Sequence, residues 1–184
     1  MRVIIIPDMV IAFHKSLNNA LIEIGFQEGR DFYRQYEIYP FQDVINPNSF
    51  ERFEKSQLYR QKREGLLWDI NQRLADKLQR RFDMSHWHTG ENDDLANFLV
   101  EAGCNAFTYS EYHAPHKLSL WLSDISFVVS VEQLGKGFNA NKINNTRQKF
   151  NAGAGFELYR NCASEIFFDN PEASKKVYMQ FRNS

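Results

Sequence analysis

The carboxylates best placed for chemistry fall in two groups. Asp8 follows the β-branched run of residues 2–6, which is typical of a buried strand. Glu91, Asp93 and Asp94 lie in a glycine turn that opens a predicted helix. Carboxylate oxygens are the ligands that Mg²⁺ and Mn²⁺ prefer, and nucleases with two metal ions use them to activate water. The two groups therefore indicate a metal site, although acidic residues in a first helical turn also stabilise the helix dipole.

Histidines form a second candidate cluster, because four of the five in the chain lie between residues 86 and 116. His86 and His88 have an HxH spacing that, on a strand, points both rings to one face, where they would act as a general acid and base beside the acidic turn. Together with His113 and His116 they would bind Zn²⁺, and Cys104 lies between the two pairs. The spacing matches no zinc motif, so an incidental cluster of surface histidines is the simpler interpretation.

Basic residues flank an acidic middle part of the chain. Residues 49–82 contain nine Lys and Arg against five Asp and Glu, residues 83–132 contain one against eight, and residues 133–160 contain five against one. Lys and Arg neutralise phosphates, so the two basic stretches are predicted to hold nucleic acid. The residues assigned to this role are Arg73, Arg80, Arg81, Lys136, Lys142, Arg147 and Lys149. A solvated helix face with i,i+4 ion pairs is the ordinary alternative.

The elements that would position these residues alternate in the first half of the chain. Apolar residues recur at helical spacing over residues 10–24, and a glycine follows that would end the helix. The aromatic segment 32–41 predicts a strand. Ser49 is a candidate N-cap for a long helical region, in which Gly65 is expected to mark a break and residues 67–82 form an apolar stripe.

The second half of the chain contains one segment with two interpretations. Residues 92–102 predict a helix that ends at Gly103, and residues 106–109 predict a strand. Apolar and polar residues over 117–134 fit either a β-hairpin or a short helix followed by a strand. From residue 139 to the end the pattern predicts short helices.

The alternation of strands and helices predicts an α/β fold, with a mostly parallel central sheet flanked by helices and a helical C-terminal extension. Asp8 would then lie at the carboxyl edge of the sheet, where such folds build their sites. If residues 105–133 form an antiparallel meander, the fold class becomes α+β. We divide the chain into an α/β domain over residues 1–134 and a helical extension over residues 135–184 that packs on the same core.

One segment resembles a motif of the NYN branch of the PIN-like ribonucleases. In that family a Tyr-Asp pair and a hydrophobic strand precede Ser-Gly-Asp-x-Asp at the start of a helix. Here Phe82 and Asp83 stand at the Tyr-Asp position, residues 84–88 at the strand and residues 89–93 at the acidic turn. The resemblance covers about residues 1–134.

The resemblance implies a metal-dependent ribonuclease. Asp8, Asp69, Glu91 and Asp93 would hold one or two Mg²⁺ or Mn²⁺ ions and a water for attack on an RNA phosphodiester. Residues 9–11 lack an Asn that the family carries after its first Asp, which leaves open a degenerate, inactive relative. The alternative function is a non-enzymatic binding or regulatory protein that engages RNA or a protein partner.

Composition limits the classes of protein to which the chain belongs. Aromatic residues make up 15% of the sequence, which argues against disorder, and no stretch approaches the ~20 apolar residues of a membrane span. Cys104 and Cys162 have no CxxC spacing and are expected to be reduced thiols. The net charge of -1 excludes a global attraction to nucleic acid, so binding needs a local patch. We expect a cytoplasmic protein without a membrane partner.

Overall fold

A computed structural model of the protein describes residues 11–38, 56–85, 94–111, 115–150, 159 and 162–182. The helices and strands of these residues are α1 (Leu17–Glu23), β1 (Phe32–Glu37), α3 (Gln57–Leu78), α4 (Asp94–Tyr109), β2 (Pro115–Leu122), β3 (Phe127–Gln133), α5 (Ala140–Phe150), β4 (Glu165–Phe168) and β5 (Lys176–Gln180). The strand predicted at residues 2–6 lies outside the described residues.

The five strands form one sheet in the order β1-β2-β3-β5-β4. Each pair of neighbouring strands in it is antiparallel. The predicted α/β fold with a mostly parallel central sheet is therefore wrong, and the described residues form an α+β fold. The connection between β2 and β3 shows why, because residues 123–126 are too few for the crossover that parallel neighbours require.

The segment after α4 confirms the hairpin interpretation. β2 and β3 pair directly, and the N–H of Ser123 donates to the carbonyl of Ser126 across the turn at 2.9 Å. The strand predicted at residues 106–109 is wrong, because α4 continues to Tyr109. Gly103, which was expected to end that helix, lies inside it, and a Cβ there would stand 2.7 Å from the Tyr59 ring. This glycine thus permits close packing of α4 against α3.

The C-terminal part of the chain adds β-structure to the same sheet. The helix predicted from residue 139 is present as α5, but the helices predicted beyond it are wrong over residues 165–168 and 176–180, which form β4 and β5. Both strands are short, and β5 lies between β3 and β4. Their inward side chains, such as Ile166 and Met179, join the main core. Runs of four or five residues are too short for periodicity to separate strand from helix.

The helix α3 carries five of the 22 basic residues of the chain. It begins after Ser56, whose hydroxyl accepts a hydrogen bond from the N–H of Tyr59, and the N-cap predicted at Ser49 lies outside the described residues. The break expected at Gly65 is absent, because α3 runs unbroken past it. The helix ends at Gln79, which adopts a left-handed conformation with φ of 53°.

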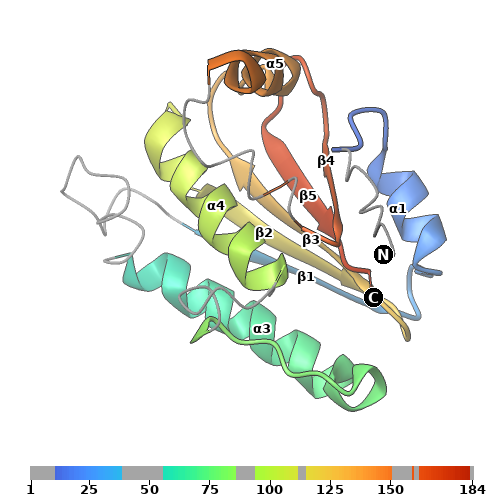
Figure 1. Ribbon diagram of the computed structural model, residues 1–184. Coiled ribbons are helices and arrows are strands. Elements are labelled where there is room, and N and C mark those ends of the chain that lie inside the picture. Colours follow the sequence, from blue (N-terminus) through green and yellow to red (C-terminus); the bar gives the residue numbers. More distant parts are fainter. Residues whose placement is uncertain are drawn as a thin grey trace, which may run out of the picture.

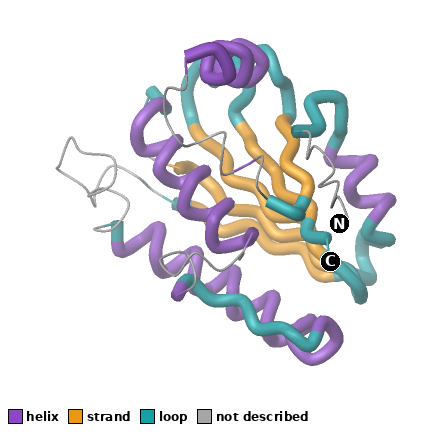
Figure 2. The backbone as a smooth tube through the Cα atoms, viewed as in Figure 1, coloured by secondary structure: helices purple, strands orange, loops and turns teal. Residues whose placement is uncertain are grey.

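Helices cover both faces of the sheet (Figure 1). α3 and α4 pack on one face, where their leucines and phenylalanines meet the inward residues of the strands in the main core. α1 packs on the other face, where Ala20 and Ile24 contact Val128, Phe167 and Tyr178. α1 ends before Gly25, whose φ of 69° suits a helix stop as predicted. The strands thus form a middle layer between helices (Figure 2).

Candidate functional site

Asp69 is the described member of the predicted metal set, and cationic groups already occupy its carboxylate. The side chain is only 1% exposed. One oxygen accepts hydrogen bonds from Arg34 Nη1 at 2.8 Å and from the hydroxyl of Tyr36. The other accepts from Arg73 Nη1 at 3.2 Å. Burial and the Asp69 carboxylate raise the pKa of Tyr36, so its hydroxyl stays a neutral donor.

Asp69 therefore pairs with two arginines, Arg34 on β1 and Arg73 one turn further along α3. A metal ion at the same carboxylate would stand beside two guanidinium groups, which repel it. The structure therefore gives no support for Asp69 as a ligand, and that role stays a prediction. The arrangement explains instead why a charged residue faces the core, since a buried carboxylate needs paired donors.

Of the other acidic candidates, Asp94 has a different partner, and the rest lie outside the described residues. Asp94, from the acidic turn, is buried and accepts the N–H of Ser164 at 2.7 Å, so it ties the start of α4 to the approach of β4. The remaining candidates of the metal and histidine sets lie outside the described residues: Asp8, His86, His88, Glu91, Asp93 and His113. No group of three or more His, Cys, Asp or Glu within the described part of the chain is placed to hold a metal ion.

Of the predicted zinc set only His116 is described, and Cys104 is the cysteine that lies between the histidine pairs in the sequence. Burial raises the pKa of Cys104 to about 12, so its thiol is protonated at neutral pH, whereas zinc binds the thiolate. His116 is half-buried in β2, and its Nδ1 has no hydrogen-bond partner among the described residues. The zinc site stays a prediction without a described pair of ligands.

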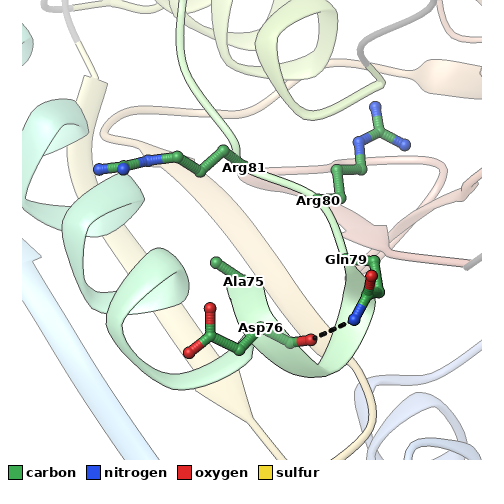
Figure 3. Close-up of a pocket in the computed structure, with 5 residues that line it drawn as sticks. All are labelled: Ala75, Asp76, Gln79, Arg80 and Arg81. Atoms are coloured by element: carbon green, nitrogen blue, oxygen red, sulfur yellow. Dashed lines mark hydrogen bonds between the residues drawn. The ribbon is translucent and has the colours of Figure 1, made fainter.

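Basic side chains gather where α3 ends. Arg80 and Arg81 follow the helix directly, and with Ala75, Asp76 and Gln79 they line an open hollow of about 500 Å³ (Figure 3). The left-handed turn at Gln79 reverses the chain, so that the two arginines extend in different directions from the rim. The amide of Gln79 donates to the carbonyl of Asp76 at 3.5 Å, which holds this turn on the last residues of the helix.

The two arginines of this hollow have different surroundings. The Arg80 guanidinium lies over the rings of Phe82 and Phe181, at 5.2 and 5.7 Å from their centroids, and is half-buried. Arg81 is exposed and makes no hydrogen bond or ion pair with another described residue. The first arginine therefore covers the core, whereas the second presents its donors to solvent.

A second hollow lies on the neighbouring side of α3, against the start of β1 and the β2–β3 turn. Its volume is about 210 Å³, and its lining residues are Arg30, Asp31, Phe32, Arg73, Lys77, Leu122, Ser123 and Asp124. Arg73 stacks on the Phe32 ring at 3.7 Å. Lys77 pairs with Asp124 at 2.6 Å, and Arg30 pairs with Asp31 at 3.0 Å.

The structure brings together only one of the two predicted basic stretches. Arg73, Arg80 and Arg81 lie at the end of α3, beside the turn that joins β2 to β3. Lys136 follows β3 and Lys142 lies in α5, and both are exposed at the opposite end of the sheet (Figure 1). Arg147 and Lys149 belong to α5, and their side chains lie outside the described residues.

Sequence reasoning missed Arg30 and Arg34 as members of this basic region, whereas Lys77 belongs to the predicted basic stretch of residues 49–82. Arg34 alternates with Phe32 and Tyr36, which places it on the inner side of β1. A charged residue on an apolar face signals a buried partner of opposite charge, so this position carried usable information. Arg30 carried no such signal, because only the tertiary packing brings it into the same hollow as Arg73 and Lys77.

No protein-family model, curated protein or solved structure matches the chain. The resemblance to the NYN branch therefore stays a prediction. Within the described residues no helix has both the length and the apolar character that crossing a bilayer requires.

Proposed function

We propose that this protein binds RNA through the C-terminal end of α3. The observation that carries the proposal is the hollow that Arg80 and Arg81 line, from whose rim Arg81 extends an exposed guanidinium (Figure 3). Guanidinium groups bind phosphate oxygens through two parallel hydrogen bonds, so they suit a nucleic-acid backbone. Phosphate contacts of this kind supply most of the affinity and position the chain without reading its sequence.

The local charge supports the proposal, although the whole chain has a net charge of -1. Residues 69–82 contain four basic residues and two acidic ones, which gives +2. Asp69 is paired with Arg73 of the same segment, and the remaining Lys77, Arg80, Arg81 and Asp76 still give +2. A short positive segment on a nearly neutral protein favours a local contact with a polyanion.

The chemistry of the hollow also favours nucleic acid over a protein partner. Ala75 is the one apolar residue in its lining, beside Asp76, Gln79, Arg80 and Arg81. The centre of a protein interface is usually apolar and depleted in charge. A polar hollow rimmed by arginine instead matches a phosphate-bearing ligand.

The test is fluorescence anisotropy with a labelled single-stranded RNA, comparing the wild type with Arg81→Ala. We expect the variant to bind about three- to tenfold more weakly and to reduce the slope of log K against log salt by about 1, because one phosphate contact is lost. Arg60→Ala is the matched control, since Arg60 lies near the other end of α3 and is exposed in an i,i+4 pair with Glu64. A DNA oligonucleotide of the same sequence tests whether the preference is for RNA.

Equal affinities of the wild type and both variants would contradict the proposal. The same binding reactions, run with Mn²⁺ or with EDTA, test the metal-dependent cleavage that the NYN resemblance implies. Metal-dependent cleavage that disappears in Asp93→Asn would add a ribonuclease activity to the binding surface. Binding without cleavage in any condition would leave RNA binding as the function.

A further inference from the structure

The second hollow contains an arginine whose position is fixed on two sides. The Arg73 guanidinium stacks on the Phe32 ring at 3.7 Å, and its Nη1 bonds to the Asp69 carboxylate at 3.2 Å. Asp69 is itself held by Arg34 and Tyr36, so the support of Arg73 is a connected set of hydrogen bonds around one buried carboxylate. A side chain that is already ordered loses little rotamer freedom when it binds a ligand.

Arg73 retains donors for a ligand. Only Nη1 is engaged, with the side chain and the carbonyl of Asp69, and the Nε and Nη2 groups have no partner among the described residues. The side chain is 36% exposed and lines the hollow. A guanidinium with one edge anchored and another edge open has the geometry for a bidentate bond to an oxyanion.

The charges around the hollow leave one positive charge unbalanced. Arg30 is paired with Asp31, and Lys77 is paired with Asp124. The remaining group consists of Arg34, Arg73 and Asp69, two cations against one carboxylate. Across the whole region four basic residues face three acidic ones. The excess charge is shared by Arg34 and Arg73, and of these two Arg73 lines the hollow.

We propose that this hollow is a binding site for a phosphate group, which Arg73 holds while Lys77 contributes from the rim. The site does not depend on the RNA-binding proposal, because the phosphate can be a free or terminal monoester or a phosphodiester within a chain. Asp124 is 75% exposed on the β2–β3 turn, so it can leave Lys77 when an anion enters. The volume of the hollow, about 210 Å³, is ample for one phosphate group and too small for a folded protein.

The direct test is a titration with inorganic phosphate, followed by the NMR signals of the arginine Nε groups. The Arg73→Lys variant assigns the Arg73 signal by its disappearance, and Arg60→Lys assigns a matched exposed arginine on the same helix. We expect the Arg73 signal to shift saturably with phosphate and the Arg60 signal to move little. Shifts of equal size and shape at both arginines would overturn the proposal, because they would show general screening only.

A second variant keeps the test independent of folding. Asp124→Asn leaves the buried bonds of Asp69 intact and removes the competing carboxylate, so we expect phosphate to bind about twofold or more tightly. Unchanged or weaker binding would contradict a role for this rim.

The source of the phosphate is tested by comparing the affinities of RNA oligonucleotides that carry a 5′-phosphate or a 5′-hydroxyl. Tighter binding of the phosphorylated form assigns a terminal phosphate to the site, and equal binding assigns a phosphodiester or free phosphate.

The two proposals fail separately. If Arg81→Ala leaves RNA binding unchanged but the Arg73 signal responds to phosphate, the hollow is an anion site outside an RNA surface. If the Arg73 signal does not respond and Arg81→Ala weakens RNA binding, the phosphate site is wrong and the RNA surface stands.

Discussion

Two charged residues, one in the middle of α3 and one just beyond its C-terminal end, have opposite surroundings. In the middle Asp69 is buried and bonded by two arginines and a tyrosine. Beyond the end Arg81 is exposed and makes no bond with another described residue. A buried carboxylate has a large desolvation cost that its partners must offset, whereas an exposed guanidinium remains hydrated until a ligand replaces the water.

This difference separates structural charge from charge that is available to a ligand. The NYN resemblance nominated Asp69 for a metal, and the basic stretch nominated Arg81 for nucleic acid. The hydrogen bonds show that the first is committed within the fold and the second is not. The predictions below test that contrast, beginning with the largest effect.

Replacing Asp69 should cost more stability than replacing any other charged residue discussed above. We expect Asp69→Ala to lower the free energy of unfolding by about 3 kcal/mol, because it leaves Tyr36 and two arginines without their common acceptor. The two arginines are partly exposed and regain some hydration, which keeps the loss from being larger. Urea unfolding followed by circular dichroism measures the change.

The control for this variant is Asp124→Asn, which removes an exposed carboxylate from its pair with Lys77. Exposed pairs contribute about 0 to 1 kcal/mol, so the control should unfold nearly as the wild type does. Similar losses in both variants would remove the distinction between the buried and the exposed carboxylate.

The two arginines at the end of α3 should differ in a smaller way. Arg80→Ala is expected to lower the free energy of unfolding by about 0.5 to 1 kcal/mol, because the guanidinium no longer covers Phe82 and Phe181. Arg81→Ala should leave stability unchanged within about 0.5 kcal/mol, since it is a surface substitution. Thermal unfolding of the two variants in parallel decides this, and a reversed order would contradict the assigned roles.

A third carboxylate lies between these extremes and should give the smallest effect. Glu23 accepts a hydrogen bond from Lys15 at 2.6 Å, which lowers the pKa of Glu23 below its ordinary value of 4.5, while partial burial opposes the shift. A lowered pKa in the folded state contributes stability above about pH 4.5 that disappears as the pH falls through the folded value. Because Glu23 is 47% exposed, we expect about 0.5 kcal/mol or less.

The measurement for Glu23 is urea unfolding of the wild type and Glu23→Gln at neutral pH and at about pH 3, well below the ordinary pKa. The wild type should be the more stable protein at neutral pH, and the difference should shrink in acid. A difference that grows in acid would show that Glu23 is not held in its charged form by Lys15.

Local patterns predicted several elements correctly. The aromatic segment 32–41 predicted a strand, which is present as β1 over residues 32–37, and the apolar stripe of α3 faces the core. Over residues 117–134 the pattern allowed a hairpin or a helix followed by a strand, and only the structure decided for the hairpin. Residues 165–168 and 176–180 were predicted to be helical but form strands, because so few residues do not show whether the hydrophobic period is that of a helix or of a strand. Gly103 was wrongly predicted to end its helix. The sequence does not distinguish a glycine that ends a helix from one that is needed because an aromatic ring, here that of Tyr59, packs against the backbone.

The amino-acid sequence by itself determined which segments are amphipathic, where charge accumulates and which residues are able to bind metal or phosphate. Tertiary structure alone decided the strand order, the antiparallel direction of every described pair and the partners of each charge. Hydrophobic periodicity acts over neighbouring residues, so the sequence displays it directly. The pairing of Arg34 with Asp69 joins residues 35 positions apart, and such a contact exists only after the sheet and α3 have packed together.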